Sequence, residues 1–248
     1  EPIWLTKPET ASRLRGRIER VLEFAKVRGH RSGDNPARWK DGLRSQLPVK
    51  SKVRAVKHHS ALPYTQVGAL MEELRGRTAI SARALEFTIL TAARTGEVIG
   101  ARWEEIDFAS RTWNVPAERM KAKRVHRVPL TDRALEILGQ LPRVDEFVFP
   151  GVRAGQPISN MTMAKLLKHL RPGITVHGFR SSFRDWVHEQ TAHPREVAEA
   201  ALGHVVGDKV EAAYRRGDAL EKRRLLMQDW QTYILEVSAN LLLPRRHP

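Results

Sequence analysis

Apolar residues recur at helical spacing through most of the chain, and this pattern predicts a largely helical protein. The first such run contains Leu14, Ile18 and Val21, and it predicts a helix over residues 7–28 that ends at Gly29. Further helices are expected over residues 64–76, 81–95, 131–138, 159–170, 178–190, 194–202 and 219–238. The last of these has an apolar face made of Leu226, Trp230, Ile234 and Val237.

The period changes between residues 106 and 130. Three short segments rich in β-branched and aromatic residues, 106–108, 111–115 and 125–130, are separated by turn-like sequence. Such segments are typical of a small antiparallel sheet with hairpin connections. The predicted fold class is therefore mainly α with a small antiparallel β-sheet, an α+β protein.

Residues 29–63 contain Gly, Pro, Asn and Ser with little apolar periodicity, as an interdomain linker would. A chain of 248 residues corresponds to one or two domains. We therefore expect a helical piece with its linker over residues 1–60 and a second domain over residues 61–248. Because the chain begins with Glu1 rather than Met, we also expect it to be a piece of a longer protein.

The charge balance favours a polyanionic partner. The chain has 43 Lys and Arg against 28 Asp and Glu, a formal net charge of +15, so nucleic acid is the first candidate. Residues 1–60 alone hold 15 basic and 6 acidic residues. Arg13, Arg17 and Arg20 share one face of the first helix, which could meet phosphates or simply be solvated. The linker adds the basic residues Lys50, Lys52, Arg54 and Lys57.

Several kinds of chemistry lack the residues they need. The chain has no cysteine, and its histidines do not form an HExxH motif, so we expect no metal site. Neither GxxxxGK[ST] nor GxGxxG occurs, and no cofactor is expected. The sequence has no apolar run of about 18 residues and no secretory signal. These features predict a cytoplasmic protein without a membrane partner.

Two candidate sites lie in the first half of the second domain. Arg94 follows a helical pattern and precedes Thr-Gly-Glu97, where an arginine could also cap a helix C-terminus. Lys121 and Lys123 lie between two predicted strands, where basic residues also serve as solubilising turn residues.

Two more candidates lie further along the chain. In His177-Gly-Phe-Arg180, the spacing of three puts an imidazole and a guanidinium on one helical face, although His177 could instead be a buried histidine. Leu202-Gly-His204 is followed ten residues later by Tyr214, although a tyrosine among alanines is more often a core residue than a nucleophile.

Taken together and in order, these motifs resemble the catalytic domain of the tyrosine recombinases, the phage-integrase family. The similarity covers about residues 64–235 and is greatest to prophage and genomic-island integrases. Residues 1–60 resemble the later part of that family's core-binding domain, and we expect the arm-binding domain that such integrases usually carry to be missing from this sequence. The resemblance rests on Ala-Arg-Thr-Gly-Glu-Val (93–98), Lys121 with Val-Pro-Leu (128–130), His-Gly-Phe-Arg (177–180), Leu-Gly-His (202–204) and Ala-Tyr (213–214).

The resemblance assigns a role to each motif residue. Tyr214 is the nucleophile, because a phosphotyrosyl ester keeps the energy of the phosphodiester bond and resealing then needs no ATP. Arg94, Arg180 and His204 stabilise charge on the phosphate without a metal ion. Lys121 is the general acid toward the 5′-oxygen.

The remaining positions have supporting roles. His177 assists proton transfer or supports the phosphate, and Glu97 orients a neighbouring cation. Lys123 is the alternative to Lys121 as the acid and otherwise contacts DNA.

The resemblance implies a site-specific recombinase that integrates or excises a prophage or genomic island. Its partner would be the core of a double-stranded attachment site, bound by a tetramer in the bacterial nucleoid. Two alternatives remain open: a type IB topoisomerase, which uses a similar residue set as a monomer, and a DNA-binding remnant without chemistry. The apolar face of the last helix could pack on its own domain or dock on a neighbouring protomer.

Overall fold

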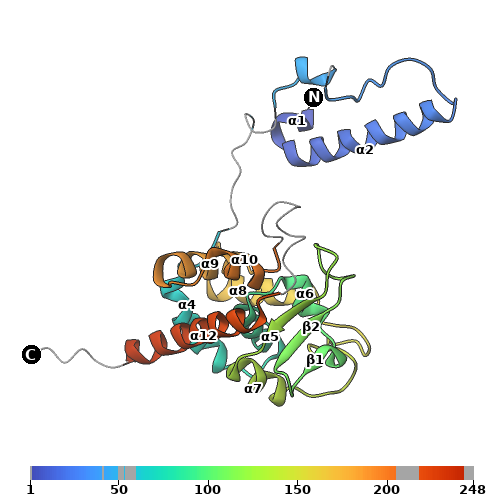
Figure 1. Cartoon of the computed structure of the whole chain (residues 1–248). Helices are drawn as coiled ribbons and strands as arrows, with labels where there is room; N and C mark the ends of the chain where they lie inside the picture. The colour runs from blue at the N-terminus through green and yellow to red at the C-terminus, as the bar shows by residue number, and fades with distance from the viewer. Residues whose placement is uncertain (1, 41, 50–52, 54–59, 205–217, 243–248) are drawn as a thin grey trace, which may run out of the picture. The chain divides into compact units, whose positions relative to one another are not determined.

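A computed structural model describes residues 2–40, 42–49, 53, 60–204 and 218–242, with the side chains of 2 and 237–242 excepted. The chain divides into two compact units, Glu1–His58 and His59–Pro248, each with its own internal contacts (Figure 1). The mainly helical composition with one small sheet agrees with the predicted fold class.

The first unit is built on one long helix. Helix α1 (Pro2–Thr6) leads into α2 (Pro8–Val27), and a short 3-10 turn, η1, follows at Leu43–Ser45. Trp4 of α1 stacks on Trp39 with ring centroids 5.3 Å apart and donates from Nε1 to the carbonyl oxygen of Pro48 at 2.9 Å. The guanidinium of Arg15 lies over the Trp39 ring. The segment after α2 therefore folds back along the helix.

This packing corrects the expectation that all of residues 29–63 form a linker. Asn35 is buried and donates to the carbonyl oxygen of Glu19 at 2.8 Å, and Trp39 covers Trp4. The polar composition of the segment concealed these two contacts, because each joins one residue to a partner far away in sequence. Leu14, Ile18 and Val21, which predicted the helix, lie on an exposed part of α2.

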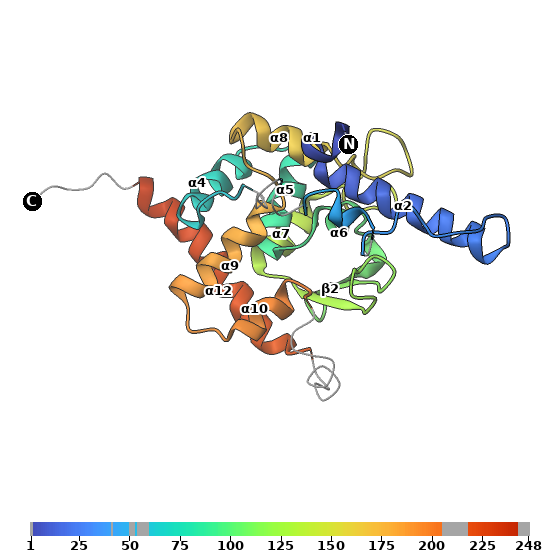
Figure 2. The ribbon, with the colours of Figure 1, turned by 90° about the horizontal axis from the view of Figure 1, so that it is seen from above.

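The second unit contains most of the helices. They are α4 (Tyr64–Arg75), α5 (Ile80–Thr91), α6 (Thr95–Ile99), α7 (Asp132–Gln140), α8 (Thr162–Leu170), α9 (Gly178–Gln190), α10 (Arg195–Ala201) and α12 (Leu220–Leu242). Apart from α6, each lies within a few residues of a predicted helix. Helix α12 begins beside the sheet and runs past α4, as both views show (Figures 1 and 2).

The sheet has the predicted position and pairing. After the 3-10 turn η2 (Trp103–Glu105), strands β1 (Ile106–Asp107), β2 (Thr112–Val115) and β3 (His126–Pro129) pair antiparallel in the order β1-β2-β3. Trp113 pairs with Ile106 on one side and Val128 on the other, and its side chain is fully buried. The ten residues between β2 and β3 carry Lys121 and Lys123.

The core of the second unit holds the apolar face of α12. Trp230 is fully buried, contacts Phe183 and Trp186 with ring centroids 5.5 and 5.0 Å away, and donates to the carbonyl oxygen of Ile89. Leu226 and Ile234 are also fully buried. These three residues pack within their own unit, which is the first of the two expectations for this helix. The side chain of Val237 lies outside the described residues.

Candidate functional site

The first candidate motif lies at a break between two helices. We expected a single helix over residues 81–95, but α5 ends at Thr91 because Ala92 takes a left-handed conformation with φ of 49°. The chain restarts as α6 with Arg94 at the N-cap. The expectation that Arg94 could cap a helix C-terminus is therefore wrong.

Glu97 fixes both the backbone and the side chain of Arg94. One carboxylate oxygen accepts from the Arg94 backbone N–H at 2.9 Å, and the other accepts from Arg94 Nη1 at 2.6 Å. Glu97 is only 4% exposed, so the pair lies mostly out of water. A charge-assisted contact of this kind holds the guanidinium in one orientation.

Arg180 lies inside the unit on α9 and is 5% exposed. It donates from Nη1 to the carbonyl oxygen of Ala92 and from Nη2 to that of Leu202, both at 2.6 Å. The left-handed turn at Ala92 and the end of α10 thus meet at one guanidinium. Burial, followed by repulsion from Arg94, lowers the pKa of Arg180 to about 10. Arg180 is still a cation at neutral pH, and the positive charge of Arg94 contributes to the lowering of its pKa.

His204 joins the same cluster from the Leu-Gly-His motif. Its Nε2 lies 3.0 Å from Arg180 Nη2, and its Nδ1 lies 2.6 Å from a carboxylate oxygen of Glu199. The three motifs around Arg94, Arg180 and His204 are widely separated in sequence and meet here.

Two glycines permit close approaches beside these residues. Gly203 has φ of +61°, and a Cβ there would lie 2.9 Å from the terminal carbon of Met120 on the β2–β3 loop. A Cβ on Gly178 would lie 2.4 Å from the carbonyl oxygen of Ser60, so only glycine lets residues 60–61 cross the start of α9. Both glycines lie inside motifs that the sequence singled out.

The loop between β2 and β3 forms one wall of an open cleft of about 500 Å³. Lys121 and Lys123 line it from the loop, and Arg94 lines it from the N-terminus of α6. Arg119 holds the loop in place by donating to the carbonyl oxygen of Glu97 and pairing with Glu105. The cleft therefore brings the first arginine motif and the lysine motif to the same surface.

His177 is the N-cap residue of α9, one turn before Arg180. Its side chain is exposed, whereas Arg180 is buried. The alternative of a buried histidine is therefore wrong for His177.

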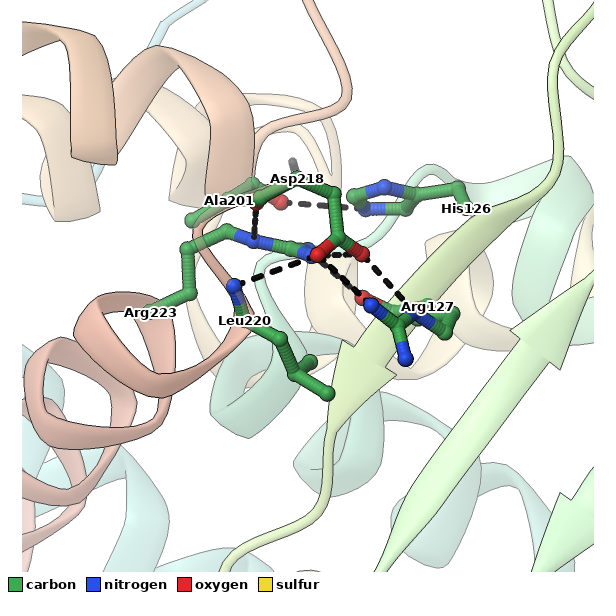
Figure 3. Close-up of polar contacts among 6 residues, drawn as sticks. All are labelled: His126, Arg127, Ala201, Asp218, Leu220 and Arg223. Carbon is green, nitrogen blue, oxygen red and sulfur yellow. Dashed lines mark hydrogen bonds and ion pairs between the residues drawn. The ribbon is translucent and has the colours of Figure 1, made fainter. Parts of the chain in front are cut away.

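Tyr214 lies outside the described residues, which resume at Asp218. Asp218 accepts from Nε and Nη2 of Arg127 at 2.9 and 2.7 Å and from Nη2 of Arg223 at 2.7 Å (Figure 3). Arg223 is 1% exposed and also donates to the Arg127 carbonyl oxygen at 2.6 Å. Burial by itself would raise the pKa of Asp218, but Arg127 and Arg223 outweigh it and lower that pKa. This cluster ties the start of α12 to β3.

His126 on β3 lies beside this cluster as a neutral side chain. Its Nε2 lies 3.3 Å from the carbonyl oxygen of Ala201, with which it makes a hydrogen bond (Figure 3). Burial, followed by the charge of Arg223, lowers the pKa of His126 to about 4.

The proposed DNA contacts are only partly described. Arg13, Arg17 and Arg20 are exposed on α2, where Arg13 pairs with Glu9 at 2.9 Å and Arg20 donates to its own helix at Gly16. Lys50, Lys52, Arg54 and Lys57 lie outside the described residues.

Within the described ranges, no three His, Asp or Glu side chains are grouped so that they could hold a metal ion. No helix in the same ranges is long and apolar enough to cross a membrane.

Sequence reasoning missed several residues that hold the site together. None of these residues belongs to a sequence motif, and only their contacts identify them. They are Arg119, Glu199, Asp218 and Arg223.

The fold and these motifs define a class of protein. The chain belongs to the phage integrase family, whose sequence profile matches residues 61–220. The profile of the phage integrase central domain matches residues 1–42.

Individual relatives agree with this class. The chain is 36% identical over 230 residues to the prophage integrase IntA of Escherichia coli (strain K12), covering 90% of this chain and 54% of that protein. It is 30% identical over 252 residues to the integrase of Enterobacteria phage P4, covering 92% of this chain and 55% of that protein. The chain thus spans about half the length of these curated relatives.

A solved structure shares the fold. Lambda integrase, in the crystal structure of a tetramer bound to a Holliday junction, superposes with a TM-score of 0.57 at 17% identity. The similarity covers 86% of this chain and 60% of that one.

Proposed function

We propose that the protein is a site-specific DNA recombinase that cleaves and rejoins strands through a 3′-phosphotyrosyl intermediate on Tyr214. The observation that carries this proposal is the convergence of Arg94, Arg180 and His204 from three separate motifs beside a cleft lined by Lys121. Two guanidiniums are suited to the charge that builds on phosphate oxygens during attack, and His204 lies against one of them.

The residues divide the chemistry among them. Tyr214 attacks phosphorus and forms the ester, and the bond to the 5′-oxygen breaks. Lys121 gives a proton to that oxygen, with Lys123 as the alternative acid. Arg94, oriented by Glu97, and Arg180 hold the non-bridging oxygens, and His177 supports the phosphate or takes part in proton transfer.

The other two tyrosines are poorly suited to act as nucleophiles. Tyr64 donates to Glu189 at 2.7 Å, and this hydrogen bond raises the pKa of its phenol. Burial raises the pKa of Tyr233 on α12. Because a phenoxide is the attacking species, these shifts work against both side chains. Tyr214 is the candidate because it alone of the three tyrosines follows the Leu-Gly-His motif shortly afterwards.

The proposed substrate is the double-stranded core of an attachment site, and the proposed assembly is a tetramer on DNA. The lambda integrase structure, a tetramer on a Holliday junction, supports this assembly. The relatives among prophage and phage integrases support integration or excision of a prophage or genomic island as the biological reaction.

A pool of nicked suicide duplexes with a randomised core tests the chemistry. We expect the protein to form a covalent 3′ adduct with a subset of the pool, also in EDTA, whereas Tyr214→Phe binds DNA and forms none. Tyr64→Phe is the matched control and should react like the wild type. An adduct formed by Tyr214→Phe would overturn the nucleophile assignment.

The selected core then separates the possible activities. Exchange between two such duplexes supports recombination. Relaxation of a supercoiled plasmid without exchange would indicate a topoisomerase, and binding without any adduct would indicate a DNA-binding remnant.

The basic face of α2 has its own test. Replacing Arg13, Arg17 and Arg20 together by Gln should reduce the log–log dependence of DNA affinity on salt by up to about 2.7, since each neutralised phosphate contributes about 0.9. An unchanged slope would show that these side chains remain in solvent when DNA binds.

A further inference from the structure

One carboxylate beside the arginine–histidine cluster has no role in the function proposed above. Glu199 lies near the end of α10, and its side chain is 14% exposed. One of its oxygens lies 2.6 Å from Nδ1 of His204, and the other lies 2.9 Å from Nη2 of Arg184 on α9. Its backbone carbonyl oxygen also accepts from the His204 backbone N–H at 2.9 Å. Glu199 therefore fixes both the backbone and the ring of His204.

The hydrogen-bond partners of His204 determine where its ring carries the proton. Arg180 has only donors, so the 3.0 Å contact requires Nε2 to offer its lone pair. Nδ1 then carries the hydrogen and donates it to the Glu199 carboxylate. If the proton moved to Nε2, two donors would face each other at Arg180, and the carboxylate would face a bare nitrogen.

We propose that Glu199 is a positioning residue for His204, holding the ring in the Nδ1-protonated form with Nε2 directed at Arg180. This inference rests on the proposed function, in which Arg180 holds the phosphate: a bare Nε2 has no hydrogen for a phosphate oxygen, so His204 in this form acts by orienting Arg180. Glu199 touches neither DNA nor the reacting atoms in this scheme and acts only through His204. The ion pair with Arg184 holds the carboxylate in place between α9 and α10.

The first experiment reads the tautomer and does not depend on catalysis. The full chain is labelled with ¹⁵N-histidine, and the His204 ring signals are assigned by their loss in His204→Gln. In the wild type above neutral pH we expect Nδ1 to show the shift of a protonated nitrogen and Nε2 that of a bare one. In Glu199→Ala the ring loses the acceptor that holds it and can turn away from Arg180, so the Nε2-protonated form should gain population substantially. An unchanged tautomer in Glu199→Ala would overturn the proposal.

The matched control is Glu196→Ala, which makes the same change on an exposed residue of the same helix. Alanine favours helix at both positions, so α10 should be retained. Circular dichroism and thermal unfolding of both variants check this. Glu196→Ala should leave the His204 signals and the cleavage rate unchanged, and a similar change in both variants would overturn the specific role of Glu199.

The second experiment is a double-mutant cycle on the rate of adduct formation with a suicide duplex. Glu199→Ala should slow cleavage by about 10- to 100-fold in the wild-type background. Losses of this size are typical when a carboxylate that orients a metal-binding histidine is removed. In the His204→Gln background the same change should cost less than about 3-fold, since the ring it orients is gone. Equal losses in both backgrounds would mean a purely structural role and overturn the proposal.

The two experiments separate this inference from the function on which it rests. If the wild type forms no adduct that depends on Tyr214, the proposed function fails. The tautomer measurement then still shows whether Glu199 controls the His204 ring.

Discussion

His126 should make the second unit sensitive to mild acid. The side chain is held neutral when folded, with a pKa lowered by burial to about 4, whereas its ordinary value is 6.5. The unfolded chain therefore binds a proton at a pH where the folded chain does not, and stability falls as pH decreases from about 6.5 toward 4. At about 1.4 kcal/mol for each pH unit between those values, the full loss is about 3 kcal/mol.

The effect is already measurable between pH 7 and pH 5. Over that range the linkage relation gives a loss of about 2 kcal/mol in the free energy of unfolding. For a unit of this size, that loss corresponds to a decrease of roughly 4–8 °C in Tm. Urea unfolding followed by tryptophan fluorescence at several pH values measures it, because Trp113, Trp186 and Trp230 all lie in the core of this unit.

His126→Gln should remove this part of the pH dependence. The glutamine amide can still donate to the carbonyl oxygen of Ala201, but it does not titrate. The difference in unfolding free energy between pH 7 and pH 5 should therefore be about 2 kcal/mol smaller than in the wild type. His169→Gln changes an exposed histidine on α8 and should keep the wild-type dependence. A His126→Gln profile that matches the wild type would refute the reasoning.

Other substitutions test the packing around the site. Trp230→Ala should cost about 3–5 kcal/mol by urea unfolding of the free protein, since a fully buried indole and its hydrogen bond are lost; wild-type stability would contradict the packing described for α12. Gly178→Ala should lower Tm, because the new Cβ collides with the Ser60 carbonyl oxygen, and an unchanged Tm would mean that residues 60–61 do not cross α9 there. Arg223→Met should cost about 3 kcal/mol, whereas Arg127→Gln should cost less than about 1 kcal/mol, because only Arg223 is buried; equal losses would show that burial does not set the difference.

Local patterns predicted the regular elements well. The three strands lie within the predicted segments because enrichment in β-branched and aromatic residues is a property of a few consecutive residues. Helix α9 has the predicted bounds of 178–190, since Phe179, Phe183 and Trp186 repeat at helical spacing and pack on the core.

The break after α5 could not be predicted in the same way. Alanine is a good helix former and rarely adopts positive φ, so nothing at Ala92 signals a helix end. The turn presents the Ala92 carbonyl oxygen to Arg180, which lies 88 residues later in the chain. The left-handed conformation of Ala92, which the helix propensity of alanine opposes, is thus accompanied by a tertiary hydrogen bond to Arg180.

In the candidate site, the residues that a motif marks could be predicted, whereas those that act through a distant partner could not. The motifs brought forward Arg94, Arg180 and His204, which the structure gathers together, while Tyr214 lies beyond the described residues and its role stays a prediction. Glu199 and Asp218 were not predicted, because a carboxylate acquires significance only from the partner that it contacts. The first segment after α2 was misjudged for the same reason, since Asn35 and Trp39 act through distant partners.

The two main-chain hydrogen bonds that hold Arg180 have a consequence for mutational studies. Its guanidinium is held by the main-chain oxygens of Ala92 and Leu202, and every amino acid supplies such an oxygen. Saturation mutagenesis at these two positions would therefore report on side-chain volume and backbone conformation while leaving the hydrogen-bond acceptors in place. Replacing the peptide linkage itself by an ester, which weakens the carbonyl as an acceptor, is the change that would reveal them. Natural variation at Ala92 and Leu202 can thus accumulate without releasing the arginine, provided the turn and the helix end keep their shape.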